Sequence, residues 1–148
     1  VLLDPGSLAF DFVRWFTGFK ISRMFCQISN IDGEESSASV LGILQNGAFL
    51  SMDMIRSYVD ETICEAVYSD ALILLTPTDN AVHVEAAGEE RQDYPAIEPL
   101  RYVVDEVVAG MESGSNPSVN YADIEAAAFL VEQARLSAKQ EKSVTPET

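Results

Sequence analysis

The chain has 148 residues, of which 47% are hydrophobic and 22% charged, as in an ordinary globular protein of one domain. With 24 acidic and 9 basic residues its formal net charge is −15, which would repel a nucleic-acid backbone or an anionic membrane surface. No apolar stretch reaches the roughly 20 residues of a membrane helix, and no signal peptide is evident. We therefore expect a cytoplasmic protein that binds neither nucleic acid nor membranes.

The first eighteen residues combine an apolar run, an Asp-Pro-Gly sequence and a helical pattern. Leu8, Phe12, Trp15 and Phe16 recur at helical spacing before Gly18. The pattern predicts a turn at Asp4-Pro5-Gly6 and a short amphipathic helix over residues 7–16, with Ser7 as its N-cap. Because the chain opens directly on this segment, we expect it to be a piece of a larger enzyme.

From Lys20 to about Ala87 the pattern becomes that of strands. The predicted strands are residues 21–28, 38–44, 48–55, 62–68, 72–75 and 81–86, with a turn at 76–80. Asn46-Gly47 is a strong hairpin signal, so the strands on either side of it should be antiparallel. In the third strand Met52 and Met54 face the side opposite to Asp53, so one face of the sheet can be covered while the other is mixed.

Two helices are predicted after Tyr94-Pro95. The first carries an apolar stripe that ends near Gly114: Ile97, Leu100, Val104, Val107, Val108 and Met111. The second begins at the N-cap Asn120, with Asp123 three residues on, and runs past Lys139. Its expected buried side is Ile124, Ala128, Val131 and Ala134. The order of elements predicts an α+β fold, with a predominantly antiparallel, open-faced sheet of about six strands and helices on one face.

Few residues carry a recognisable chemical signal. The chain lacks a glycine-rich dinucleotide fingerprint, a phosphate-binding loop and any His or Cys cluster, so we expect no metal site. His83 stands alone in an alternating strand and should face solvent or a neighbouring chain. Cys26 and Cys64 are expected to be buried reduced thiols, with a disulfide as the weaker alternative. Glu34 and Glu35 are interpreted as solvated charges in a turn.

One segment nevertheless resembles a known family. Residues 4–18, D-P-G-S-L-A-F-D-F-V-R-W-F-T-G, resemble the D-x-G-x-H-x-x-D-x-x-x-W-x-x-G segment of the Gfo/Idh/MocA oxidoreductases, which act mainly on sugars and cyclitols with a nicotinamide cofactor. Residues 35–53 and the stretch from Tyr94 onward also look like this family. The resemblance implies one domain over residues 1–148, with the glyceraldehyde-3-phosphate dehydrogenase-like C-terminal fold. The family's N-terminal Rossmann domain is absent from this chain.

The resemblance also implies a site. Asp4 and Asp11 match the two acids of the segment, whereas Leu8 takes the place of the family's proton-transferring His. Because Leu cannot exchange a proton, Asp4 itself or a residue of the missing half would have to replace the His. We expect Asp4 to hydrogen-bond or deprotonate a substrate hydroxyl, with Leu8 and Asp11 beside the substrate. NAD or NADP would be bound mainly by the missing domain. The implied partners are that Rossmann domain, a polyol or sugar, and other copies of the chain in a homodimer or homotetramer through the open sheet face.

Three functional hypotheses follow. The leading one is the substrate-binding and oligomerisation domain of an NAD(P)-dependent oxidoreductase that acts on a sugar or cyclitol hydroxyl; the isolated chain should then be inactive. The second is a non-catalytic ligand-binding or regulatory module that kept the family fold, which Leu8 favours. The third is a free-standing sheet protein that only self-associates.

Overall fold

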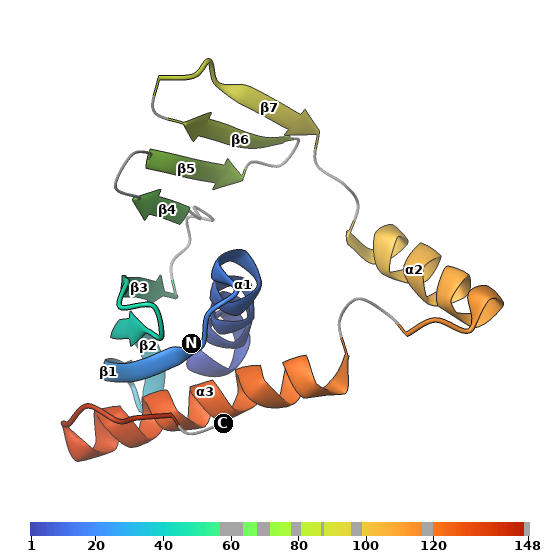
Figure 1. Cartoon of the computed structure of the whole chain (residues 1–148). Helices are drawn as coiled ribbons and strands as arrows, with labels where there is room; N and C mark the ends of the chain where they lie inside the picture. Colours follow the sequence, from blue (N-terminus) through green and yellow to red (C-terminus); the bar gives the residue numbers. More distant parts are fainter. Residues whose placement is uncertain are drawn as a thin grey trace. The chain divides into compact units, whose positions relative to one another are not determined.

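The computed structural model describes residues 1–56, 64–67, 72–77, 81–86, 88–95, 99–116 and 120–146. It divides into two compact units, Val1–Arg56 with Ser118–Thr148 and Ser57–Pro117 (Figure 1). The elements of the first unit are η1 (Leu2–Gly6), α1 (Ser7–Thr17), β1 (Ile21–Ile31), β2 (Glu34–Leu44), β3 (Phe49–Ile55) and α3 (Tyr121–Gln140). Those of the second are β4 (Cys64–Val67), β5 (Leu72–Pro77), β6 (Ala81–Ala86), β7 (Gln92–Pro95) and α2 (Pro99–Ser113). The remaining parts of the predicted strand 62–68 and of the predicted turn 76–80 lie outside the described residues.

The first unit is built on an antiparallel sheet in the order β1-β2-β3. The predicted hairpin between β2 and β3 is confirmed: Gly47 has a φ of +88°, and the Ala48 N–H donates to Asn46 Oδ1 at 3.0 Å. A second tight turn joins β1 to β2 at Asp32 and Gly33, both with positive φ. Such turns match the twist of the strands they connect, which explains why β1 and β2 pair over most of their length.

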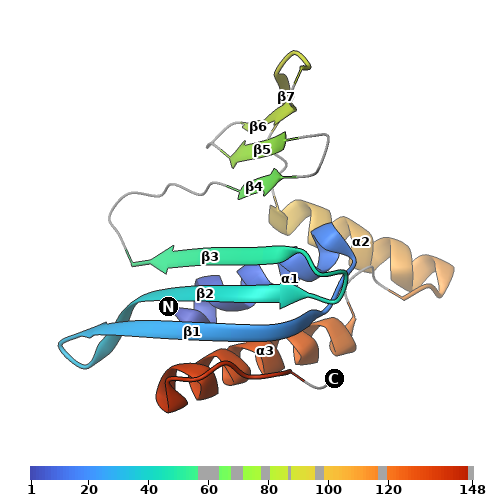
Figure 2. The ribbon, with the colours of Figure 1, turned by 60° about the vertical axis from the view of Figure 1, so that its left-hand side comes forward.

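One face of this sheet is covered by α1 and α3 (Figure 2). Side chains alternate along each strand, so Val40 is buried against the helices while Leu41 is exposed on the other face. Met54 is buried and Met52 packs against the same core, as predicted. The buried apolar residues of this core are Leu2, Phe10, Ile21, Met24, Cys26, Ala38, Val40, Leu44, Met54, Leu130, Val131 and Ala134.

The start of α3 is confirmed, but its predicted buried side is partly wrong. Asn120 Oδ1 accepts from the Ala122 N–H at 2.8 Å, and Asp123 Oδ2 accepts from the Asn120 N–H at 3.1 Å, which completes a capping box. Ile124 is 61% exposed and Ala128 is exposed as well. The buried side of the helix is instead Ala127, Leu130, Val131, Ala134 and Ser137. Alanines on several sides of α3 make its apolar stripe ambiguous in the sequence.

The second unit contains an antiparallel sheet in the order β4-β5-β6-β7, followed in the chain by α2. The described residues thus form seven strands where the sequence predicts about six, and β7 is the addition. Four apolar residues of the predicted α2 stripe are exposed: Val104, Val107, Val108 and Met111. The α+β class with antiparallel sheets is confirmed.

Candidate functional site

The Asp-Pro-Gly sequence forms a turn of π-helix, η1, rather than the predicted turn before a helix. Pro5 has no N–H, and the Gly6 N–H bonds to the carbonyl of Val1, five residues back, at 3.2 Å. Gly6 lies close to β3: a Cβ there would lie 3.3 Å from Leu2 Cδ2 and 3.4 Å from Met54 Sδ. The absence of a side chain at Gly6 therefore lets η1 pack closely on the sheet.

Because η1 continues directly into α1, Ser7 is not an N-cap, which corrects the sequence prediction. Ser7 has helical backbone angles, and its hydroxyl lies 2.9 Å from the carbonyl of Leu3 and 3.0 Å from that of Asp4. The predicted end of the helix is confirmed, since Gly18 caps α1 in the left-handed conformation with a φ of +70°.

The three predicted site residues lie on the outward side of η1 and α1. Asp4 is exposed, Leu8 is 70% exposed and Asp11 is partly exposed, whereas Leu2 and Phe10 point into the core. The spacing of four and three residues repeats the turn of a helix, so these side chains lie along one side of it. Within the described part of the chain the Asp4 carboxylate has neither a hydrogen bond nor an ion pair. Its oxygens are therefore available to a ligand.

The same side of α1 also carries exposed aromatic side chains. The sequence pattern placed all the large apolar residues of this helix on a single face. Trp15 is 76% exposed; its ring centroid lies 5.9 Å from that of Phe12, which stacks on Phe16 at 5.5 Å. Phe10 instead fills the core. The helix thus has two apolar sides, and a large exposed apolar side is typical of a surface that another molecule or domain covers.

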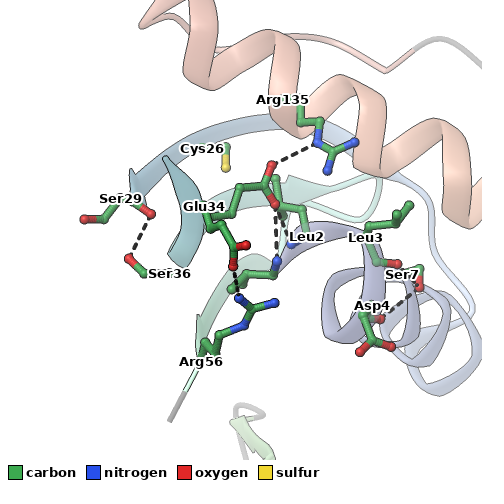
Figure 3. Close-up of polar contacts among 12 residues, drawn as sticks. Leu2, Leu3, Asp4, Ser7, Cys26, Ser29, Glu34, Ser36, Arg56 and Arg135 are labelled. Carbon is green, nitrogen blue, oxygen red and sulfur yellow. Dashed lines mark hydrogen bonds and ion pairs between the residues drawn. The ribbon is translucent and has the colours of Figure 1, made fainter. Parts of the chain in front are cut away.

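Glu35 anchors η1 to the rest of the unit; Figure 3 labels two of its partners, Leu2 and Arg135. Its Oε1 accepts from Arg135 Nε of α3 at 3.1 Å, and its Oε2 accepts from the Leu2 N–H at 3.2 Å and from the Val1 amino group at 3.3 Å. Burial opposes the charge, but these hydrogen bonds outweigh it and lower the pKa of Glu35 below its usual value. The interpretation of Glu35 as a solvated turn residue is therefore wrong.

Arg14 ties α1 to the start of α3. Its Nη1 donates to the main-chain oxygen of Asp123 at 3.3 Å, and its Nη2 lies 3.7 Å from Asp123 Oδ1. Asp11 Oδ1 is 3.9 Å from the same guanidinium. Arg14 is thus already engaged by two acids, so it offers little to a phosphate at this surface.

The other residues singled out in the sequence lie elsewhere. His83 is partly buried on β6, and its Nδ1 lies 2.7 Å from Asp93 on β7; Arg91 and His83 together lower the pKa of Asp93. Cys26 is a buried free thiol, as predicted; burial and then the charge of Glu35 raise its pKa to about 11, which makes it unreactive. The side chain of Cys64 is outside the described structure.

The described residues contain no group of acids, His and Cys that could hold a metal ion, and none of the described helices is long and apolar enough to span a membrane.

Comparison with known proteins finds the fold of this chain in solved oxidoreductases. No family model and no curated protein sequence matches the chain. An oxidoreductase domain protein from Kribbella flavida matches 98% of this chain with 49% of its own, at a TM-score of 0.82 and 15% identity. The aldose-aldose oxidoreductase from Caulobacter crescentus, solved with glycerol, matches 95% of this chain with 45% of its own, at a TM-score of 0.79 and 16% identity.

The WlbA dehydrogenase from Bordetella pertussis, solved with NADH and UDP-GlcNAcA, matches 99% of this chain with 45% of its own, at a TM-score of 0.68 and 12% identity. The chain therefore spans about half the length of the structures it matches. At these identities the likeness establishes the fold. The fold that the resemblance implies is therefore found in solved oxidoreductases.

Proposed function

We propose that this chain is the C-terminal, substrate-binding and oligomerisation domain of an NAD(P)-dependent oxidoreductase that acts on a sugar or cyclitol hydroxyl. The observation that carries the proposal is the outward side of η1 and α1, where Asp4 and Asp11 flank exposed Leu8 and exposed Trp15 follows one turn later. The shared fold with oxidoreductases, of which this chain spans about half, supports it. In the parent protein residues 1–148 would form one domain acting in the cytoplasm.

Asp4 is the proposed catalytic group. Its unpaired carboxylate would accept a hydrogen bond from a substrate hydroxyl and could take its proton, while Asp11 would bind a second hydroxyl. Leu8 would contact the apolar face of the ring. Since a Leu side chain cannot exchange a proton, Asp4, or else a residue of the domain outside this chain, would take the role that the family assigns to a His at that position.

The outward side of η1 and α1 does not fit the diphosphate of a nicotinamide dinucleotide. The outward side of η1 and α1 presents the carboxylates of Asp4 and Asp11, and its guanidinium, Arg14, is engaged by Asp11 and Asp123. A diphosphate would be repelled there. We therefore propose that NAD or NADP is bound mainly by an N-terminal Rossmann domain outside this chain, and that the isolated chain is inactive.

The proposal is tested in the full-length protein with Asp4→Asn, which keeps the size of the side chain but removes its basicity. We expect kcat/KM for sugar-dependent NAD(P) reduction to fall about a hundredfold or more. Asp32→Asn is the matched control, because Asp32 is exposed in the β1–β2 turn with a φ of 53°, which Asn also adopts. Unchanged turnover and substrate affinity in the Asp4 variant would remove Asp4 from the site.

The second candidate is a ligand-binding or regulatory module that kept the fold without the chemistry. Leu8 favours it, since it occupies the position of the family's proton-transferring His. If the protein is an oxidoreductase that lost activity with its His, Leu8→His in the full-length protein should raise turnover. Sugar binding without any turnover, in both the wild type and Leu8→His, would support the module.

A further inference from the structure

We infer that Glu35 and Arg135 are positioning residues that hold η1, and with it Asp4, in place on the first unit. The role assigned to Asp4 rests on the proposed function, but the anchoring itself does not. Neither Glu35 nor Arg135 belongs to residues 4–18, the segment that carries the predicted site residues Asp4, Leu8 and Asp11.

The pair joins three elements that are far apart in the sequence. Glu35 lies on β2, Arg135 on α3 and Leu2 on η1, and one carboxylate contacts the other two through separate oxygens at 3.1 and 3.2 Å. The Glu35 side chain is only 24% exposed. The Leu2 side chain is fully buried beside this contact. A shift of the carboxylate would therefore displace the start of η1.

The turn that carries Asp4 depends on such support more than an ordinary helical turn does. The first N–H groups of a helix have no partner within it, and in η1 Pro5 contributes no N–H at all. The carboxylate of Glu35 supplies the partner for the Leu2 N–H. The next interactions along the turn are the bond from the Gly6 N–H to Val1 O at 3.2 Å and the contacts of the Ser7 hydroxyl with Leu3 O and Asp4 O.

The charge of Glu35 is needed for this arrangement. The groups that face it are the Arg135 guanidinium from α3, the Val1 amino group from the start of the chain and the Cys26 thiol from β1. Arg135 also has a second acidic neighbour, since Glu132 Oε1 lies 3.7 Å from its Nη1. A neutral Gln at position 35 would keep the size of the side chain. However, its hydrogen bonds to the Arg135 guanidinium and the Leu2 N–H would be weaker than those of the Glu35 carboxylate.

The neighbouring pair Glu34–Arg56 provides a matched control. Glu34 precedes Glu35 on β2, and its Oε2 lies 2.6 Å from Arg56 Nη1, a closer contact than any that Glu35 makes. However, the side chain of Glu34 is 75% exposed, and among the described residues the pair has no hydrogen bond or ion pair with η1. Glu34→Gln thus removes an ion pair of the same chemistry from the same strand without loosening η1.

The experiment is amide hydrogen exchange of this chain, measured by NMR for wild type, Glu35→Gln and Glu34→Gln. In Glu35→Gln we expect exchange of the Gly6 amide to rise about tenfold, as expected for losing a hydrogen bond to a charged group. The amides of β2 and α3 should keep their protection, and Glu34→Gln should leave η1 unchanged. An equal rise throughout the unit, or none at Gly6, would overturn the inference.

Two further variants keep the test decisive. Acetylation of the Val1 amino group removes that charge while leaving Arg135 and the Leu2 N–H, so η1 should stay protected. If Glu35→Gln fails to fold, Arg135→Lys, which keeps the charge but loses the guanidinium geometry, should give the same local rise at Gly6 in a smaller amount. Unchanged Gly6 exchange in Arg135→Lys would then overturn the inference.

The link to Asp4 is tested separately in the full-length protein. Glu35→Gln should lower kcat more than it raises KM, and it should have little further effect in an Asp4→Asn background. Additive losses would show that the pair does not act through Asp4. If Gly6 exchange responds while turnover responds to neither variant, the anchoring stands and the proposed function of Asp4 fails.

Discussion

Ser137 shows how one polar side chain holds the buried contact between α3 and β1. Its Oγ accepts from the Cys26 N–H at 2.9 Å and donates to the carbonyl of Lys142 at 2.6 Å, and the residue is fully buried. Ser137→Ala would leave both backbone groups without a partner, so we expect the free energy of unfolding to fall by about 1–3 kcal/mol in urea titrations. Ser143→Ala, at an exposed position after α3, is the control and should change it little. Equal stability of the two variants would contradict this account.

The charge of Glu35 predicts how stability depends on pH. Its pKa is lower in the folded chain than the ordinary value of 4.5. A lowered pKa contributes stability that is fully present above the unfolded pKa and is lost as pH falls through the folded one. The difference in unfolding free energy between wild type and Glu35→Gln should therefore be largest above the ordinary value and shrink below it. A difference that is constant from neutral to acid pH would exclude the ionised carboxylate as its source.

At the scale of elements, the capping box of α3 allows a direct test of how much its N-cap residue stabilises the fold. Asn120→Ala removes the acceptor of the Ala122 N–H, so the free energy of unfolding should fall by about 0.5–2 kcal/mol. Because Asp123 also bonds to the Asn120 N–H and contacts Arg14, loosening of this end should extend to α1. Asn30→Ala, at an exposed position late in β1, is the control. Thermal unfolding followed by circular dichroism measures both.

The elements that were predicted correctly carry local signals. Asn46-Gly47 specifies its hairpin and Asn120 with Asp123 specifies the start of α3, because the deciding hydrogen bonds join neighbours in the chain. The π-helical turn of η1 was missed because Asp-Pro-Gly is typical of ordinary turns. The buried side of α3 was misplaced because alanines occur on several of its sides.

The candidate site also contains residues that the sequence suggested and one, Glu35, that it could not. The exposure of Asp4 and Leu8 agrees with the segment that suggested them, although Trp15 was expected on a single apolar face. Glu35 could not be found from the sequence, because its partner Arg135 is 100 residues away and a pair of adjacent glutamates is usually solvated. Contacts of this kind become visible only once the fold brings β2 and α3 together.

At the scale of the whole molecule, the open face of the first sheet bears on self-association. Leu41 on β2 is 59% exposed and lies opposite Phe25 on β1, and Phe49 and Ile55 on β3 are also exposed. Exposed apolar side chains gathered on one face are typical of a surface that a partner covers. We propose that this face joins copies of the chain in a homodimer or homotetramer.

Light scattering of the wild type and of two variants tests this assembly. Leu41→Glu places a charge at the centre of the open face and should give monomers, whereas Leu8→Glu, at a similarly exposed position on α1, should leave the oligomer intact. Dissociation by Leu8→Glu alone would place the contact on the α1 side instead.

Net charge adds a second, independent signature of the same assembly. Each copy carries a formal charge of −15, so two copies repel each other at long range while the open face attracts at contact. Raising the ionic strength from about 0.01 M to about 0.15 M shortens the screening length from roughly 30 Å to roughly 8 Å, which removes most of the repulsion but leaves the apolar contact. The dissociation constant should therefore fall as salt rises, and Leu41→Glu should remain monomeric throughout. An oligomer that salt dissociates would instead be held by ion pairs, and the open apolar face would not be its interface.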